Sequence, residues 1–375
     1  MQIYWDYNST TPTDKRVVDF MLPYFYEHFG NAASNTHVWG WKAAEAVKTA
    51  REILANAIGS GESEIIFTSG ATESINLALK GAAEIYATAG GHVITVQTEH
   101  KAVLDTCAYL EEKGIEISYL PVKKDGLIDL AELEAAFTPK TFLVCVMMAN
   151  NETGVIQPIR EIAEIAHRHN ALMMSDCVQA FGKISVKVDD LGIDLMPISA
   201  HKFYGPKGVG ALYIRRRNPR VKLAPFLHGG GHERGLRSGT LNVPGIVGMG
   251  KATEICMEEM TVESIRLQGF RNKIEQELTQ KTNAVVNGNL TQRLNHVTNL
   301  TFPGLKSETL LMKIPQIAVS SGSACTSALN SPSHVLMAME LTEAEAYSAI
   351  RISLGRFTTE EEAEKGITII LKSIT

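Results

Sequence analysis

The chain has 375 residues, of which 45% are hydrophobic and 21% charged, and its formal net charge of -5 gives no reason to expect nucleic acid or an anionic membrane as a partner. Its longest apolar run, residues 142–149, is far shorter than a membrane span, and its N-terminus lacks the basic and apolar segments of a signal peptide. Five cysteines without paired spacing argue against a disulfide framework and predict a cytoplasmic protein.

The first 175 residues alternate between predicted helices and predicted strands. A polar turn at residues 7–14 caps a helix over 15–29, and a second helix over 39–58 ends at Gly59. Strands are then predicted at 65–68, 93–96, 115–120, 142–148 and 171–175, and helices at 75–83, 102–113, 130–137 and 159–169. Because strands and helices alternate and the strands are apolar throughout, this half predicts an α/β fold whose mostly parallel sheet is buried on both faces.

The pattern changes towards the C-terminus. Two more apolar strands, at 193–198 and 209–214, precede helices over 246–260 and 264–280. Short strands near 285, 297–302 and 316–319 follow, and a last helix begins after residues 358–360. A chain of this length predicts two domains. We expect a large domain at 15–255 and a smaller α+β domain formed by 1–14 and 256–375.

The most informative stretch, residues 199–210, lies between two apolar strands and contains Lys202 followed by three glycines and a proline. A lysine at a strand end against apolar walls is desolvated, which favours its neutral, nucleophilic amine. Pyridoxal phosphate (PLP), which binds as a Schiff base, requires such a lysine. The alternative is a Gly-Pro turn with a solvated lysine, and the other motifs must decide between the two.

Residues 68–74 join a strand to a helix. Ligands of parallel sheets bind at the carboxyl ends of the strands, where this segment lies. Gly70 permits close approach of a ligand, and Thr72 and Ser74 offer hydroxyl groups. The free N–H groups and the dipole at a helix N-terminus suit a phosphate group, although helix capping alone also explains such residues.

Three further strand ends carry polar side chains. Asp176 is costly to bury unless it is paired, and a protonated pyridinium nitrogen would pair it, although an N-cap is equally consistent with the motif. His100 either stacks on a flat cofactor or caps the next helix. Asn150 and Asn151 follow the most apolar strand, where the pair can form an Asx turn or one of them can contact a ligand.

Among the cysteines, Cys325 alone lies in a loop of small residues, 320–332, which predicts a reactive thiol. Three others are predicted core residues: Cys107, Cys145 and Cys256. Cys177 adjoins Asp176. Arg351 lies within an apolar run and needs an anionic partner, either a substrate carboxylate or an Asp or Glu of the protein.

Seven segments resemble one family in their residues and order: 68–74 (TSGATES), 99–102 (EHKA), 150–154 (NNETG), 199–202 (SAHK), 237–240 (RSGT), 320–325 (SSGSAC) and 351–357 (RISLGRF). Together they resemble the cysteine desulfurases, in the NifS/IscS-like group of class-V PLP-dependent aminotransferases. The resemblance covers nearly the whole chain.

The resemblance implies a PLP-dependent homodimer of fold type I, with a mostly parallel seven-stranded sheet and a smaller domain that carries the cysteine loop. It implies conversion of L-cysteine to L-alanine and transfer of the sulfur to Cys325 as a persulfide. An acceptor protein, either an iron–sulfur scaffold or a tRNA-thiolation protein, would then take the sulfur. No metal is implied.

The resemblance also implies roles for individual residues. Lys202 would hold PLP and move protons, and His100 would stack on the ring and is the candidate base. Asp176 would hold the pyridine nitrogen and Gln179 the ring hydroxyl. The phosphate would be bound by Ala71, Thr72, Ser199 and His201, helped by Thr240 of the partner subunit. Asn151 and Arg351 would bind the substrate carboxylate.

Three features depart from the family pattern. Gly30-Asn-Ala32 replaces the usual Gly-Asn-Pro. Cys177 stands where the family usually has alanine, and the chain stops at Thr375, so docking of an iron–sulfur scaffold does not follow from the resemblance. The rival hypotheses are another PLP-dependent lyase or an aminotransferase, neither of which needs Cys325, and a non-catalytic partner protein that retains the fold. The presence of Lys202, Asp176 and Cys325 argues against the last.

Overall fold

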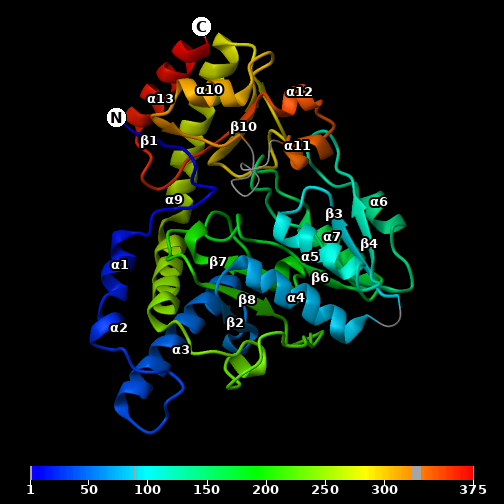
Figure 1. Cartoon of the computed structure of the whole chain (residues 1–375), viewed down its shortest axis with the longest axis vertical. Coiled ribbons are helices and arrows are strands. Elements are labelled where there is room, and N and C mark those ends of the chain that lie inside the picture. The colour runs from blue at the N-terminus through cyan, green and yellow to red at the C-terminus, as the bar shows by residue number, and fades with distance from the viewer. Residues whose placement is uncertain (1, 88–89, 322–330, 375) are drawn as a thin grey trace.

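Seven apolar strands form the central sheet of the structure, a computed structural model that describes residues 2–87, 90–321 and 331–374 (Figure 1). The strands lie in the order β2-β8-β7-β6-β5-β3-β4. Their bounds are Ile65–Thr68 (β2), His92–Val96 (β3), Glu116–Leu120 (β4), Thr141–Cys145 (β5), Leu172–Met174 (β6), Leu195–Ser199 (β7) and Gly210–Ile214 (β8). Only β8 runs antiparallel to its neighbours, β2 and β7. The predicted α/β fold with a mostly parallel seven-stranded sheet is confirmed.

Alternate residues of these strands enter two separate hydrophobic cores. Ile94 of β3 and Val144 of β5 pack into one core, whereas Val93 and Leu143 pack into the other. Helices α4 (Ala71–Tyr86) and α5 (Lys101–Glu111) cover the second core, and α3 (Val38–Ile58) and α7 (Ile159–Arg168) cover the first. Burial on both faces explains why these strands lack the alternating polarity of half-exposed strands.

The N-terminal helical region differs from the prediction. One helix was expected over 15–29, but α1 (Lys15–Met21) and α2 (Pro23–Tyr26) are separate. Pro23 has no N–H group to continue the hydrogen-bond ladder, and the pattern restarts there. The cap is as expected, since the Asp14 carboxylate accepts from the Arg16 N–H at 3.0 Å. Gly59, with φ 76°, ends α3 in the left-handed region that favours glycine.

Strand β5 is shorter than predicted, because it ends at Cys145 and not at residue 148. The N–H group of Met147 donates to the Glu99 carboxylate, which interrupts the strand ladder. Two short helices complete this part of the fold: α6 (Leu130–Ala135) and α8 (Val188–Leu191).

Two smaller sheets lie at the other end of the molecule (Figure 1). One has the order β12-β10-β9, and the other pairs β1 with β11. Their strands are Ile3–Tyr4 (β1), Val285–Val286 (β9), Val297–Thr301 (β10), Ile317–Ala318 (β11) and Ala349–Ser353 (β12). Helices α10 (Ser307–Lys313), α11 (His334–Ala338), α12 (Glu343–Ala346) and α13 (Glu360–Ile374) accompany them. The sequence analysis did not predict β1, β12, α10, α11 or α12.

Helix α9 (Val243–Lys281) is one continuous helix of 39 residues, whereas two helices broken near residue 262 were predicted. Residues 261–263, Thr-Val-Glu, contain neither glycine nor proline, so nothing forces a break there. The helix packs against α3 near Gly250, and against α13 near Lys273, whose Nζ donates to Glu364 at 2.7 Å. The predicted domain boundary at residue 255 lies inside α9, and the division into two domains stays a prediction.

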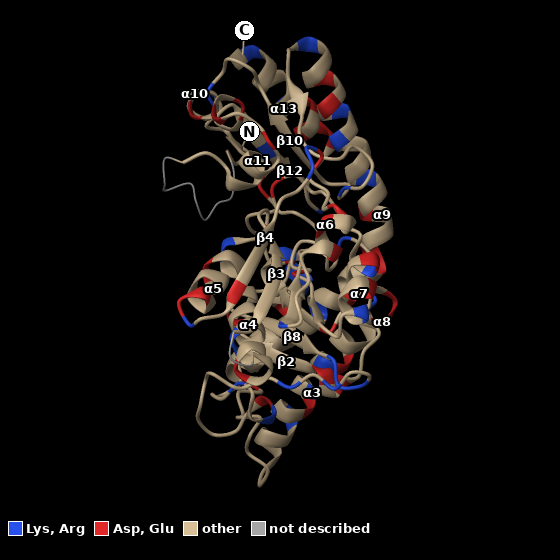
Figure 2. Ribbon diagram, turned by 90° about the vertical axis from the view of Figure 1, so that its right-hand side faces the viewer, with Lys and Arg blue, Asp and Glu red and all other residues tan. Residues whose placement is uncertain are grey.

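Charged residues lie mainly on the helices and loops, while the strands of the central sheet carry few of them (Figure 2). Lys and Arg alternate with Asp and Glu along the outer helices (Figure 2). Within the described ranges, no helix combines the length and the apolar character needed to cross a bilayer.

Candidate active site

The carboxyl ends of the parallel strands open into a cavity of about 480 Å³. This volume lies in the range of about 300–1,000 Å³ that is usual for small-molecule sites. Ten of the twelve predicted site residues line the cavity: Ala71, Thr72, His100, Asn151, Asp176, Gln179, Ser199, His201, Lys202 and Arg351. Thr240 is exposed and does not line it. Cys325 lies outside the described residues.

One end of the cavity is formed by the first turn of α4. Gly70 precedes the helix with φ 154°, and no side chain caps the N-terminus of α4. The turn lies against the neighbouring strand, because a Cβ atom on Gly210 would come within 2.5 Å of the Ile198 carbonyl oxygen and 2.7 Å of the Gly70 Cα. The helix N-terminus with Ala71 and Thr72 is therefore available to an anion.

Ser74 does not belong to this anion site, although the sequence made it a candidate. Its Oγ lies 2.8 Å from Thr68 Oγ1, and both residues are buried. Ser199 and His201, at the end of β7, line the cavity instead. Burial and the charges of Lys202 and Lys207 lower the pKa of His201 to about 4, so its imidazole is neutral at pH 7.

Lys202 lies in a 3₁₀ turn directly after β7 and is half-buried. Its Nζ donates to the carbonyl oxygens of Asn8 at 2.7 Å and Ser9 at 2.8 Å. The expectation of apolar walls around the Lys202 amine is therefore wrong, because the N-terminal segment supplies polar acceptors. The amine is nevertheless held at the strand end, as predicted, and faces the cavity.

Asp176 follows β6 and is buried in the cavity wall. Its Oδ1 accepts from the Val178 N–H at 2.9 Å. Burial raises the pKa of Asp176, and the Val178 N–H and the nearby His100 and Lys202 only partly oppose this effect. A buried carboxyl of this kind fits a cationic ring nitrogen, which would add a counter-charge to that of Lys202.

His100 caps the next helix, which is one of the two alternatives that the sequence left open, and its stacking on a cofactor stays a prediction. It is the N-cap of α5, with Nδ1 accepting from the Ala102 N–H at 3.1 Å, and its ring also lines the cavity. Burial lowers the pKa of His100, so the ring is neutral near pH 7. Because Nδ1 is an acceptor, the neutral ring carries its proton on Nε2.

Gln179 is buried and connects two parts of the site. Its Nε2 donates to the Asn8 carbonyl at 2.9 Å, and its Oε1 accepts from Lys183 Nζ at 2.6 Å. Burial, and after it the charge of Lys202, lowers the pKa of Lys183 to about 7. The sequence analysis did not single out Lys183, which lies behind the cavity wall.

Arg351, on β12, finds a protein partner, which was one of the two predicted possibilities. Its Nη2 lies 2.7 Å from both Asp6 Oδ1 and Ser9 Oγ, and its Nη1 donates to the Asn151 carbonyl at 2.9 Å. The same guanidinium lines the cavity. Its Nε is buried and has no hydrogen-bond partner in the described part of the chain.

Asn150 and Asn151 take different roles: one forms an Asx turn, and the other lines the cavity. Asn150 forms the Asx turn, since its Oδ1 accepts from the N–H groups of Glu152 at 2.9 Å and Thr153 at 3.0 Å. Asn151 is left to line the cavity.

Four cysteines are described, and all four are buried free thiols: Cys107, Cys145, Cys177 and Cys256. Burial raises the pKa of each one. The expectation that Cys107, Cys145 and Cys256 are core residues is confirmed. Cys177 packs against Met148, with 3.8 Å between the two sulfur atoms.

The N-terminal segment was missed as part of the site. Asn8, Ser9 and Thr10 line the cavity, and Thr10 Oγ1 lies 3.1 Å from His201 Nδ1. The sequence showed only a polar turn at residues 7–14. The run of polar residues was a weak signal, because these residues act partly through their backbone carbonyls.

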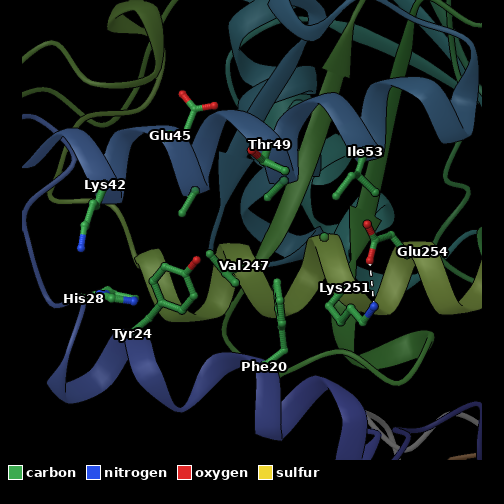
Figure 3. A pocket seen from close by; sticks show the side chains of 13 residues that line it. Phe20, Tyr24, His28, Lys42, Glu45, Thr49, Ile53, Val247, Lys251 and Glu254 are labelled. Atoms are coloured by element: carbon green, nitrogen blue, oxygen red, sulfur yellow. Dashed lines mark hydrogen bonds and ion pairs between the residues drawn. The ribbon is translucent and has the colours of Figure 1, made fainter.

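A second cavity, of about 340 Å³, lies between α1, α2, α3 and α9 (Figure 3). Phe20, Tyr24 and Val247 point into it, and Lys251 pairs with Glu254 at its edge, at 3.0 Å (Figure 3). None of the predicted site residues lines it. The chemistry therefore belongs to the first cavity.

The residues of the first cavity fit PLP. The uncapped first turn of α4, with Thr72, Ser199 and His201, suits the phosphate group. Asp176 is a buried carboxylate in need of a cation, and Lys202 is the amine that Schiff-base attachment requires. Anion site, carboxylate and amine all line one cavity.

Comparisons with known proteins agree with this arrangement. The model of the aminotransferase class-V family matches residues 3–365. Cysteine desulfurase IscS from Anaeromyxobacter dehalogenans (strain 2CP-C) is 52% identical over 368 residues, which cover 98% of this chain and 91% of that protein. Cysteine desulfurase IscS from Ehrlichia chaffeensis (strain ATCC CRL-10679 / Arkansas) is 50% identical over 375 residues, 100% of this chain and 91% of that protein.

Solved structures are similar over the whole chain. A NifS-like protein is 40% identical with a TM-score of 0.93, and the match covers 100% of this chain and 99% of that one. A structure described as SspA in complex with cysteine is 39% identical with a TM-score of 0.84, covering 96% of this chain and 100% of that one. The chain therefore belongs to the class-V aminotransferase family and, within it, to the PLP-dependent cysteine desulfurases of the NifS/IscS-like group.

Proposed function

We propose that the cavity at the sheet edge converts L-cysteine to L-alanine and that Cys325 receives the sulfur as a persulfide. One observation carries the proposal: the amine of Lys202, the buried carboxyl of Asp176 and the guanidinium of Arg351 line a single cavity. The first two fit PLP, and the third fits the carboxylate of an amino acid. The similarity to a protein whose structure is described as a complex with cysteine supports the choice of substrate.

Bound PLP supplies an electron sink that weakens the bonds at the α-carbon of the substrate. Asp176 would keep the pyridine nitrogen protonated, and Gln179 would hold the ring hydroxyl. The N-terminus of α4, from Ala71, would hold the phosphate group with Thr72, Ser199 and His201. Lys202 would move protons at Nζ, and the ring of His100 would stack against the cofactor.

Asn151 and Arg351 would bind the substrate carboxylate. Asp6 already pairs with Nη2 of Arg351. The Nε atom of Arg351, however, is a buried donor without a partner among the described residues. A carboxylate oxygen would satisfy this donor, and leaving such a buried donor unpaired costs about 1–3 kcal/mol.

In the sulfur step, the Cys325 thiolate would attack the substrate sulfur. An S–S bond forms, the Cβ–S bond breaks with its electron pair left on carbon, and a proton added at that carbon gives alanine. On either side of residues 322–330, described residues contact the segments that carry Arg351 and Asn151. The N–H group of Ser320 donates to the Arg351 carbonyl at 3.2 Å, and Ser333 Oγ donates to Glu152, beside Asn151, at 2.5 Å.

We also propose that the enzyme is a homodimer. Large hydrophobic side chains are exposed along residues 18–41: Val18, Phe20, Leu22, Phe25, Tyr26, Phe29, Val38, Trp39 and Trp41. Exposed apolar clusters of this size are typical of interfaces. Thr240 is exposed and lies outside its own cavity, which leaves it free to contribute to the phosphate site of the partner subunit.

The division into a large domain, 15–255, and a small domain, 1–14 with 256–375, is likewise a proposal. One hydrophobic cluster, with Trp5, Phe302 and Ile370, takes its buried members only from residues 3–5 and 267–370. The sulfur acceptor would be an iron–sulfur scaffold or a tRNA-thiolation protein, and the name IscS on the relatives supports the first. A cytoplasmic location agrees with the four buried free thiols.

The test of this function uses PLP-loaded protein, L-cysteine and a reductant, with alanine and sulfide measured together. We expect equal amounts of both products from the unaltered protein and from Cys177→Ala, because Cys177 only packs in the core. Cys325→Ala should keep its PLP but release no sulfide and carry no persulfide. Extra mass on Cys177 after L-cysteine treatment, or alanine without sulfide, would contradict the proposal.

A further inference from the structure

Asn8, at the wall of the cavity, forms hydrogen bonds through both its backbone and its side chain. It is only 1% exposed. Its carbonyl oxygen accepts from Lys202 Nζ at 2.7 Å and from Gln179 Nε2 at 2.9 Å. Its side-chain Nδ2 donates to the Asn151 carbonyl at 3.0 Å.

The contacts of the Asn8 side chain define its orientation. The Asn151 carbonyl oxygen can only accept, so the amide nitrogen of Asn8 must face it. Oδ1 of Asn8 then accepts from Nε2–H of His296 at 2.8 Å. The Asn8 N–H donates to Ser353 Oγ at 3.0 Å, which fixes the peptide on its other side. Both backbone groups and both side-chain polar atoms of Asn8 are thus engaged.

Through these hydrogen bonds, Asn8 connects residues that have different roles in the proposed reaction. Lys202 and Gln179 share one carbonyl oxygen, so the position of that oxygen sets the separation of their polar groups. Asn151 is tied to the same residue through the side chain. If the Asn8 side chain were lost, its peptide would keep the bond to Ser353 but lose the links to Asn151 and His296.

We infer that Asn8 is a positioning residue of the desulfurase reaction: it holds the resting place of Lys202, aligns Gln179 and fixes the Asn151 loop. This inference rests on the proposed function, because it assumes that these three residues bind cofactor and substrate. Reacting groups are sensitive to small displacements, and a shift of about 1 Å can cost on the order of a hundredfold in rate.

The first variant is Asn8→Ala, measured on PLP-loaded protein. We expect it to fold and bind PLP, with a kcat/KM for L-cysteine that is lower by about ten- to a hundredfold. The visible circular dichroism of the bound cofactor should also change, because Gln179 and Lys202 would hold it differently. A purely structural residue would leave that spectrum unaltered.

The second variant, Asn8→Asp, keeps the size of the side chain and the acceptor for His296. A carboxylate oxygen then faces the Asn151 carbonyl, so one hydrogen bond is replaced by two repelling acceptors. We expect KM for L-cysteine to rise more than kcat falls, because Asn151 is proposed to bind substrate. This variant tests the side-chain link even if Asn8→Ala proves unstable.

Gln157→Ala is the matched control. Gln157 is also a buried amide that bridges two backbone groups, the Gly126 carbonyl at 2.7 Å and the Ile128 N–H at 3.0 Å, but it does not line the cavity. Its loss should lower the melting temperature and leave kcat, KM and the visible spectrum unchanged. The positioning role is overturned if both Asn8 variants behave like this control while the unaltered protein makes alanine and sulfide. Absence of both products from the unaltered protein would instead refute the proposed function.

Discussion

Asp176 illustrates a conflict between stability and function within one side chain. It is a carboxyl whose pKa is raised by burial, so the folded protein without cofactor gains little from it. The same burial would make its interaction with a cationic ring nitrogen strong. We therefore expect Asp176→Asn to lower kcat by about 10²–10³-fold, the usual cost of losing one preorganised electrostatic group.

The cofactor-free form of Asp176→Asn should melt at or above the temperature of the unaltered protein, because an amide is cheaper to bury than a carboxylate. Thermal denaturation without PLP and steady-state kinetics with PLP are the two measurements. Near-normal turnover, with Cys177→Ala as the neighbouring control, would remove Asp176 from the mechanism.

Site residues that act through their side chains were easier to predict from the sequence than those that act through backbone groups. Residues that act through a distinctive side chain, such as Lys202 and Asp176, were found from strand ends. Others, such as Ser199 and His201, were predicted only from the family resemblance, and ten of the twelve predicted residues line the cavity. Asn8 and Ser9 were missed because their carbonyl oxygens bind Lys202, and every residue has a carbonyl. The Asp6–Arg351 pair was missed because 345 positions separate its members in the chain.

The helices and strands, too, could be predicted only where the sequence carries a distinctive pattern. Apolar strands such as β7 were located closely, because burial on both faces leaves a continuous apolar run. The length of α9 was underestimated, since the sequence lacks a breaker between residues 260 and 264 but also lacks a strong periodic signal there. Strand β12 was missed because Arg351 interrupts its apolar pattern. The ion pair with Asp6 and the hydrogen bonds to Ser9 and Asn151 make that arginine tolerable inside a buried strand.

The junction between β2 and α4 provides a test at this scale. A methyl group in Gly210→Ala would press on the Gly70 Cα and the Ile198 carbonyl, a clash of the kind that costs about 1–3 kcal/mol. If the N-terminus of α4 shifts to relieve it, the dissociation constant for PLP should rise about tenfold for each 1.4 kcal/mol lost from the bound state.

The matched control is Gly269→Ala in α9, where an added Cβ meets nothing within 4 Å. Alanine replaces an exposed mid-helix glycine there, which should stabilise the fold by about 0.5–1 kcal/mol. Urea denaturation and PLP titration of both variants separate the two effects. An unchanged PLP affinity in Gly210→Ala would argue against a phosphate site at the start of α4.

At the scale of the whole molecule, the exposed hydrophobic residues at 18–41 predict self-association. Phe25 and Phe29 are 61% and 65% exposed. Sedimentation equilibrium should give the mass of two chains for the unaltered protein. A double variant, Phe25→Lys with Phe29→Lys, should weaken the dimer, because two charges would have to be desolvated at the interface. Met312→Lys, at a side chain that is 75% exposed on α10, is the control and should leave the dimer intact.

The contacts of the N-terminal segment also have a consequence for the timing of protein synthesis. Residues 3–11 leave the ribosome long before their partners, because Ile3 pairs with Ile317, Asp6 with Arg351 and Asn8 with Ser353. At roughly 5–20 residues per second, the segment waits on the order of tens of seconds for these partners. An unfinished chain already contains Lys202 but not Arg351. Under the proposed roles, sulfur chemistry can therefore begin only after Arg351 has been translated.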